Sequence, residues 1–315
     1  MSDEIEQNAP DSGVDFANAD RKRELRGMFF ALVGASCWGF SACCVSFLTD
    51  RNGVDILWLA DTRLLLAGTL FLIIALVRDR KRLLALFSDR KLVFHLVLYA
   101  LLAVVLMQLT YMPAIKYTNP GTALFLLELS IPMVLVFDCV RGRRLPSLVE
   151  AIALVLALAG VLAIATQGNL GSLGISPIGL MFGLLAAISN ASYIILGGRL
   201  VDSCGSLITN GVGMLLGALI LLPFGRPWEV PQEMDASGWM AFAGIVLIGT
   251  MLAYVLYLRG VSDAGRVRAS LIGVFEPVSG VIISALWLGT VFSGWDFLGG
   301  VAIVAMMILV ALEKR

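Results

Sequence analysis

Charged residues and histidine are scarce in this sequence. Only 15% of its 315 residues are charged, and it contains a single histidine. One histidine argues against a histidine-rich metal site and against a Ser/His/Asp triad. The sequence also lacks the GxxxxGKS/T, GxSxG and HExxH motifs, which argues against an ATPase and against an integral-membrane enzyme. We therefore expect no enzymatic activity, no cofactor and no metal ion.

The cysteines are too few and too dispersed to suggest a disulfide framework. There are five, an odd number, and each lies in or beside an apolar stretch. This placement predicts buried thiols that act as small apolar residues. They are Cys37, Cys43, Cys44, Cys139 and Cys204.

Hydrophobic residues, in contrast, make up 59% of the chain, and its mean hydropathy is +0.90. Soluble domains are closer to half apolar. The excess is arranged in blocks of about 20 residues, the length that a helix needs to cross roughly 30 Å of hydrocarbon. This pattern predicts an all-α polytopic membrane protein with ten transmembrane helices. The predicted spans are 27–48, 55–77, 92–111, 118–140, 146–166, 177–198, 206–224, 237–257, 265–287 and 294–312.

Lysine and arginine predict how the chain is oriented. When alternate connections are grouped, the basic clusters at 78–82 and 141–144 fall on the same side as both chain ends. The opposite side carries Arg51, Lys116 and Arg226. Because basic connections remain in the cytoplasm, both termini are expected there. The polar residues 1–26 are expected to be a disordered cytoplasmic tail and not a secretory signal.

Small residues reveal an internal repeat. The first and sixth spans each carry four small residues at four-residue spacing, and the two rows are 152 positions apart. Such rows let helices approach closely in lipid. The rows are Gly27, Ala31, Ala35 and Gly39, and Gly179, Gly183, Ala187 and Ala191.

Two further segments extend this correspondence. The segment YMPAIK at 111–116 resembles YVLYLR at 254–259, and in the spans that follow them Pro132 matches Pro277. Five spans in each repeat is an odd number, so the second copy must enter the membrane from the opposite face. We expect a first five-helix repeat at 27–166 and a second at 177–312, inverted around a central cavity.

These features resemble the drug/metabolite transporter superfamily, and in particular its EamA-type ten-helix members. The resemblance rests on ASCWG at 35–39, Arg63, and FEPV at 275–278, within a repeat that covers about residues 27–312. It implies a five-plus-five inverted-repeat bundle around a central cavity. It also implies a multi-pass carrier of the bacterial inner membrane, often an exporter of amino acids or related metabolites.

The two halves depart from each other in two ways. Asn190 stands where Trp38 would repeat. Glu128 lies one turn before its proline, whereas Glu276 is adjacent to its own. The two sides of the cavity are therefore expected to differ chemically.

Three ionisable residues lie deep inside predicted spans: Arg63, Glu128 and Glu276. Facing lipid, each would cost roughly 2.5–3.5 kcal/mol or more, so they are expected to face a cavity or a partner. Pro132 cannot donate to the carbonyl of Glu128, and Pro277 likewise interrupts its span, so each break is expected to free a carbonyl beside a carboxylate. This pair of groups suits an ammonium group, a cation or a proton. The alternative is that the prolines only kink the helices and the glutamates pair with Arg63.

Other residues are candidates for the walls of the cavity. Trp38 and Asn190 are repeat-related and near the membrane midplane, although Trp38 could instead pack the first helix. Tyr111 and Tyr254 lie near predicted span ends, where packing in the aromatic belt is the commoner role. Asp61 is expected to reach the outer interface. The remaining candidates are Tyr99, Gln108 and Tyr193.

The leading functional hypothesis is a secondary carrier for a small polar or zwitterionic metabolite that works by alternating access. Glu128 and Glu276 would bind a cationic group or a coupling proton, and Arg63 would hold a carboxylate. An alternative is efflux of lipophilic cations or drugs, and a further one is a non-transporting enzyme or receptor. The expected partners are a small-molecule substrate, the lipid bilayer and a coupling proton or cation, but no nucleic acid. A homodimer is an alternative to a monomer.

Overall fold

The computed structural model describes residues 12–86, 89–169, 171–232 and 234–313. Over these residues the chain is helical and contains no strand. Nine helices in this part are long and apolar enough to cross a membrane, and a shorter apolar helix, Leu271–Trp287, supplies the tenth span. The protein is therefore an all-α multi-pass membrane protein, as predicted. Its five cysteines are buried free thiols.

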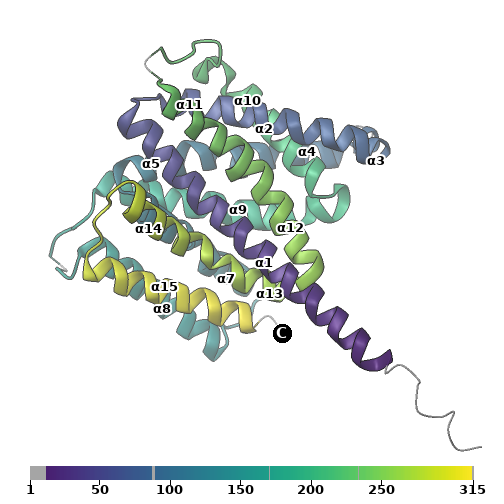
Figure 1. Cartoon of the computed structure of the whole chain (residues 1–315). Helices are drawn as coiled ribbons and strands as arrows, with labels where there is room; N and C mark the ends of the chain where they lie inside the picture. The colour runs from purple at the N-terminus through teal and green to yellow at the C-terminus, as the bar shows by residue number, and fades with distance from the viewer. Residues whose placement is uncertain (1–11, 87–88, 170, 233, 314–315) are drawn as a thin grey trace, which may run out of the picture.

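Several spans consist of more than one helical segment (Figure 1). The short helix α3 (Arg80–Leu86) connects the second and third spans. In chain order the spans are α1 (Ser12–Ser46) with the π-helical η1 (Phe47–Arg51); α2 (Ile56–Arg78); α4 (Arg90–Tyr99), η2 (Ala100–Val105) and α5 (Leu106–Tyr117); α6 (Pro120–Leu127) and α7 (Ser130–Arg141); α8 (Leu148–Thr166); α9 (Pro177–Cys204); α10 (Ser206–Gly225); α11 (Ala236–Ala243), η3 (Gly244–Leu252) and α12 (Ala253–Ala264); α13 (Arg266–Gly273) and α14 (Phe275–Trp287); and α15 (Gly294–Glu313).

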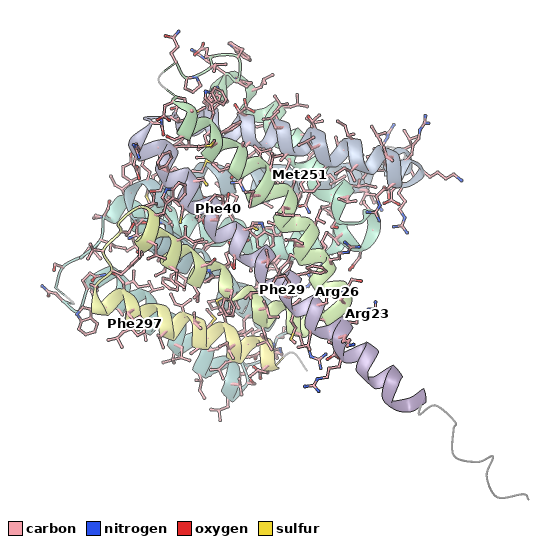
Figure 2. All side chains as sticks on the ribbon, viewed as in Figure 1. Arg23, Arg26, Phe29, Phe40, Met251 and Phe297 are labelled. Atoms are coloured by element: carbon pink, nitrogen blue, oxygen red, sulfur yellow. The ribbon has the colours of Figure 1, made fainter. Side chains whose placement is uncertain are left out.

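The first helix begins earlier than the sequence suggested. Residues 12–26, expected to be disordered, form the N-terminal part of α1, and residues 1–11 lie outside the described residues. The part of this extension that adjoins the bundle is held by ion pairs, because Arg23 and Arg26 contact Asp263 at the end of α12 at 3.3 and 2.9 Å. Figure 2 shows both arginines on the end of α1 that projects past the rest of the bundle.

The two halves of the chain interlock instead of forming separate bodies. α1 packs against α12 and α14, whereas α9 packs against α5 and α6. α2 packs against α10, and α8 against α15. Each of these pairs joins one helix from the first half to one from the second.

The predicted rows of small residues lie at these inter-half contacts. A Cβ atom added at Gly39 would lie 2.7 Å from the carbonyl oxygen of Glu276. One added at Gly179 would lie 3.0 Å from the carbonyl oxygen of Tyr117. Since a larger side chain would force the backbones apart, glycine at these positions allows α1 to reach α14 and α9 to reach α5.

The spans that contain Pro132 and Pro277 are each interrupted just before that proline. Pro132 is the third residue of α7 and Pro277 is the third residue of α14. A proline has no N–H to offer to the preceding turn, so the helix cannot continue through it undisturbed. Glu128 lies in the first break, and Glu276 lies in the first turn after the second break.

The carbonyl of Glu128 is not free, contrary to the prediction. The N–H of Ile131 donates to it at 3.1 Å, and the N–H of Met133 donates to the carbonyl of Leu129 at 3.2 Å. A tighter turn of the 3₁₀ type thus replaces the hydrogen bond that is lost at Pro132. What this break offers to a ligand is therefore the carboxyl side chain of Glu128 and not its backbone.

Asp235 joins the two halves at the end of the bundle where α11 begins. Its Oδ1 accepts hydrogen bonds from the Ser237 hydroxyl at 2.7 Å, the Gly238 N–H at 2.7 Å and the Asn52 side-chain amide at 3.2 Å. These bonds, that of Ser237 first, hold the pKa of Asp235 below its usual value. The carboxylate form is therefore favoured in the folded protein.

Asp235 is the N-cap residue of α11, and its carboxylate is expected to make a pH-dependent contribution to the stability of the fold. Because folding lowers the pKa of Asp235, its contribution is complete above the ordinary aspartate value of about 3.9 and is lost as the pH falls through the folded value. Asp235→Asn should keep a working N-cap without a titrating group. The thermal midpoint of the wild type should exceed that of the variant at neutral pH, and the difference should shrink below about pH 4. A difference that does not change with pH would contradict this.

Candidate functional site

A central cavity of about 240 Å³ is lined by residues of both halves. Its walls come from α1, α2, α4, η2, α5, α6, α9, α10, η3, α12 and α14, together with Glu128 in the break of the fourth span. Every residue that the sequence suggested as substrate-binding lines it. These are Trp38, Arg63, Tyr99, Gln108, Glu128, Asn190, Tyr193 and Glu276.

Arg63 lines the cavity and donates a hydrogen bond to a hydroxyl group. Its Nε donates to the Thr250 hydroxyl at 3.4 Å. In the described part of the chain, no carboxylate oxygen lies within 4.0 Å of its guanidinium. Arg63 therefore does not form the alternative ion pair with Glu128 or Glu276 in this structure. The guanidinium can bind a planar anionic group of a ligand.

Glu128 and Glu276 present two carboxyl groups to the same cavity. Glu128 is 8% exposed, and Glu276 is partly buried. No lysine or arginine nitrogen in the described residues lies within 4.0 Å of either group. Two enclosed carboxylates repel each other and are poorly solvated, so a cationic group or a proton would stabilise this arrangement.

A hydrogen-bonded cluster of hydroxyl groups forms another wall. Tyr99 donates to Oδ1 of Asn210 at 2.9 Å, and Tyr193 donates to the same oxygen at 3.4 Å. The hydroxyls of Tyr193 and Tyr254 are 3.2 Å apart. Sequence reasoning missed Asn210 and Thr250. In sequence, a single uncharged polar residue in an apolar span does not reveal whether it faces a cavity or bonds to the backbone of its own helix.

Aromatic rings surround Trp38. Its ring lies 5.5 Å from that of Tyr254, edge to face, and 5.0 Å from that of Tyr257. Tyr254 and Tyr111 line the cavity, so the prediction that they pack in an interfacial belt is wrong. The reason is that the third and eighth spans continue to Tyr117 and Ala264. Both tyrosines therefore lie farther from the helix ends than the apolar pattern indicated.

The repeat-related positions Trp38 and Asn190 differ in their contacts. Trp38 packs on aromatic rings, whereas Asn190 donates from its side-chain amide to the Ser130 hydroxyl at 3.0 Å. Ser130 is the first residue of α7, directly after the break that contains Glu128. One side of the cavity is thus aromatic and the other is polar, as the departure from the repeat suggested.

The described residues contain three π-helical segments that were not predicted from the sequence, and two of them border the cavity. η2 and η3 lie in the third and eighth spans, the two spans that carry the YMPAIK and YVLYLR segments. Both segments contribute cavity residues, including Val104 and Thr250. π-helical turns occur frequently at functional sites because the extra residue redirects the side chains of one turn. Hydrophobic periodicity could not reveal them, since both stretches are apolar on all sides.

Several pairs of the helices around the cavity are in contact. α1 contacts α5 and α6, and α14 contacts α6. α9 and α12 meet through the hydroxyl groups of Tyr193 and Tyr254, and both tyrosines line the cavity.

Comparisons with known proteins agree with this architecture. A profile of the EamA-like transporter family matches residues 25–166 and again residues 177–312. The chain is 31% identical over 290 residues to the uncharacterized inner membrane transporter YicL of Salmonella typhimurium, covering 92% of this chain and 96% of that protein. It is 26% identical over 197 residues to Protein PecM of Dickeya dadantii, covering 62% and 66%. A crystal structure with 16% sequence identity shares the fold, with a TM-score of 0.61 over 94% of this chain and 98% of that chain.

Proposed function

The chain belongs to the EamA-like transporter family, and from this premise we propose that it is a secondary carrier that exports an amino acid or a related small zwitterion across the bacterial inner membrane. The observation that carries the proposal is that groups of both charge signs lie in one cavity. Among the described residues, Arg63 has no carboxylate partner there, and Glu128 and Glu276 have no cationic partner.

The cavity can satisfy both ends of a zwitterion. Arg63 would bind the carboxylate of the substrate, while the hydroxyl of Thr250 accepts a hydrogen bond from the Nε of Arg63. Glu128 and Glu276 would bind the ammonium group or a coupling proton. A volume of about 240 Å³ is smaller than the roughly 300–1,000 Å³ of pockets for drug-sized ligands. It therefore favours a small metabolite.

Alternating access would occur around this cavity. The interlocked packing suggests that the moving units are not the two repeats but two mixed groups: α1 with α12 and α14, and α9 with α5 and α6. The distribution of basic residues supports an orientation with both termini in the cytoplasm.

Efflux of a lipophilic cation is a second candidate, and one observation favours it. Trp38, Tyr254 and Tyr257 form an aromatic cluster in the region of Glu276, and aromatic faces attract organic cations. Such a substrate has no carboxylate and would not need Arg63.

A variant of Arg63 separates these candidates. In proteoliposomes tested with a panel of amino acids, Arg63→Gln should weaken transport about 10- to 100-fold, because a charge-assisted hydrogen bond contributes about 1.5–3 kcal/mol. Arg226→Gln is the matched control, since Arg226 is 59% exposed at the surface. Two results together would contradict the zwitterion proposal. The wild type would transport no amino acid, and Arg63→Gln would transport lipophilic cations as well as the wild type does.

A further inference from the structure

A buried acidic residue outside the cavity has no role in the proposed binding of substrate. Asp61, in the second turn of α2, is 0% exposed. Neither of its carboxyl oxygens has a hydrogen-bond partner among the described residues. The prediction that Asp61 reaches the outer interface is therefore wrong. Burying an ionised carboxylate without a partner is strongly unfavourable, so this environment selects the uncharged acid.

The last turn of α10 encloses this carboxyl group. A Cβ atom added at Gly225 would lie 2.7 Å from Oδ2 of Asp61 and 2.8 Å from the carbonyl oxygen of Leu57. The carboxyl thus lies against the C-terminal end of a helix, where carbonyl groups without helical partners carry the negative end of the helix dipole. Negative charge at this position would be repelled, whereas a carboxylic acid can lie there and donate.

The charged groups on the neighbouring elements do not compensate a carboxylate. Arg226 follows Gly225 but pairs with Glu229 at 3.3 Å and is 59% exposed. On α2 itself, Asp55 is exposed and caps the helix, and Arg63 faces the central cavity. On α5, Lys116 is exposed, and η3 has no charged residue. In the described residues no cation lies within 4.0 Å of the buried carboxyl.

A second cavity adjoins the surroundings of this carboxyl group. Its volume is about 660 Å³, and its lining includes Leu57, Trp58 and Gly225. Gly225 contacts Asp61 and also lines this cavity. Separation of the ends of α2 and α10 would therefore open the carboxyl group to the water of this cavity.

We propose that Asp61 is a proton-binding site that is distinct from the substrate cavity. It holds a proton as a carboxylic acid while the ends of α2 and α10 are packed together. When the two ends separate, the O–H bond breaks, the proton passes to water in the adjoining cavity, and the carboxylate remains. The proposal rests on the proposed carrier function, because it links this proton to the opening of one end of the bundle.

Infrared spectroscopy of the full-length protein in lipid tests the protonation directly. At neutral pH the wild type should show the C=O stretching band of a carboxylic acid, and the band should shift in D₂O. Asp61→Asn should remove it, and Asp55→Asn, which changes an exposed carboxylate of the same helix, should leave it in place. Absence of an aspartic-acid band from the wild type would overturn the proposal.

Isotope labelling keeps this test independent of whether the variant folds. Labelling the wild type with side-chain ¹³C-aspartate should shift the same band, and among the described aspartates Asp61 is the one that is buried. A band that does not shift belongs to a glutamic acid, and this result would also overturn the proposal.

A transport measurement tests the link to conformational change. With amino acids as probes, Asp61→Asn should retain exchange without a gradient and lose the stimulation of net flux by a proton gradient. Stimulation equal to that of the wild type would overturn the link. Absence of all amino-acid transport in the wild type would count against the proposed function, and the infrared result would still decide the protonation of Asp61.

Discussion

Replacing either cavity glutamate by its amide, Glu128→Gln or Glu276→Gln, should lower amino-acid transport about 10- to 100-fold. Loss of one charge-assisted hydrogen bond to the substrate ammonium group removes about 1.5–3 kcal/mol of binding free energy. The amide has nearly the shape of the carboxyl group, so the cavity should keep its form. Flux into proteoliposomes, measured over a range of substrate concentrations, provides the test.

The two variants should not be equivalent. Glu128 is 8% exposed and lies between two helical segments, whereas Glu276 is less buried and lies in the first turn of α14, where the helix dipole stabilises a negative charge. We therefore expect Glu128→Gln to be the better tolerated change.

A surface carboxylate supplies the control for both glutamates. Glu229 is 59% exposed and pairs only at the surface, so Glu229→Gln should transport like the wild type. If Glu128→Gln and Glu276→Gln also transport and bind as the wild type does, the glutamates are not ligands of the substrate. The carrier assignment would then have to rest on Arg63 alone.

The strongest features of the fold could be predicted because the bilayer leaves the chain few choices. Apolar blocks of sufficient length must be helices, since every backbone group in lipid needs an internal partner. A charged side chain is also costly in lipid, so Arg63, Glu128 and Glu276 were expected in the interior, and all three line one cavity. Span ends were harder to predict, because charged residues such as Lys116 and Asp263 continue helices beyond the apolar pattern.

Other features depend on contacts that no local pattern encodes. The partner of the Glu128 carbonyl is set by how the chain closes around Pro132, and the sequence suggested a free carbonyl where a tight turn forms. The burial of Asp61 depends on the approach of Gly225, which is 164 positions away in the chain. A single acidic residue near a helix end is most simply read as interfacial, so only the packing of α2 on α10 corrects that interpretation.

Adding one methyl group at Gly39 should disrupt the cavity more than its size suggests. In Gly39→Ala the new Cβ would lie 2.7 Å from both the carbonyl oxygen of Glu276 and the backbone nitrogen of Gly280, and closer still to the Ser279 hydroxyl. Backbone atoms on a packed helix cannot move aside as a flexible side chain can. α1 and α14 must therefore separate, at a cost of about 1–3 kcal/mol. The broken span that carries Glu276 should move with α14, so transport should fall together with the thermal midpoint.

A second glycine-to-alanine variant controls for the change in composition. At Gly198, on the exposed face of α9, an added Cβ would meet no atom within 4 Å. Gly198→Ala should therefore leave transport unchanged and should stabilise the helix by roughly 0.5–1 kcal/mol. Thermal unfolding in detergent and flux in proteoliposomes should be measured on both variants. Equal behaviour of Gly39→Ala and Gly198→Ala would mean that α14 does not contact α1 as closely as the structure indicates, and the placement of Glu276 beside the cavity would lose its support.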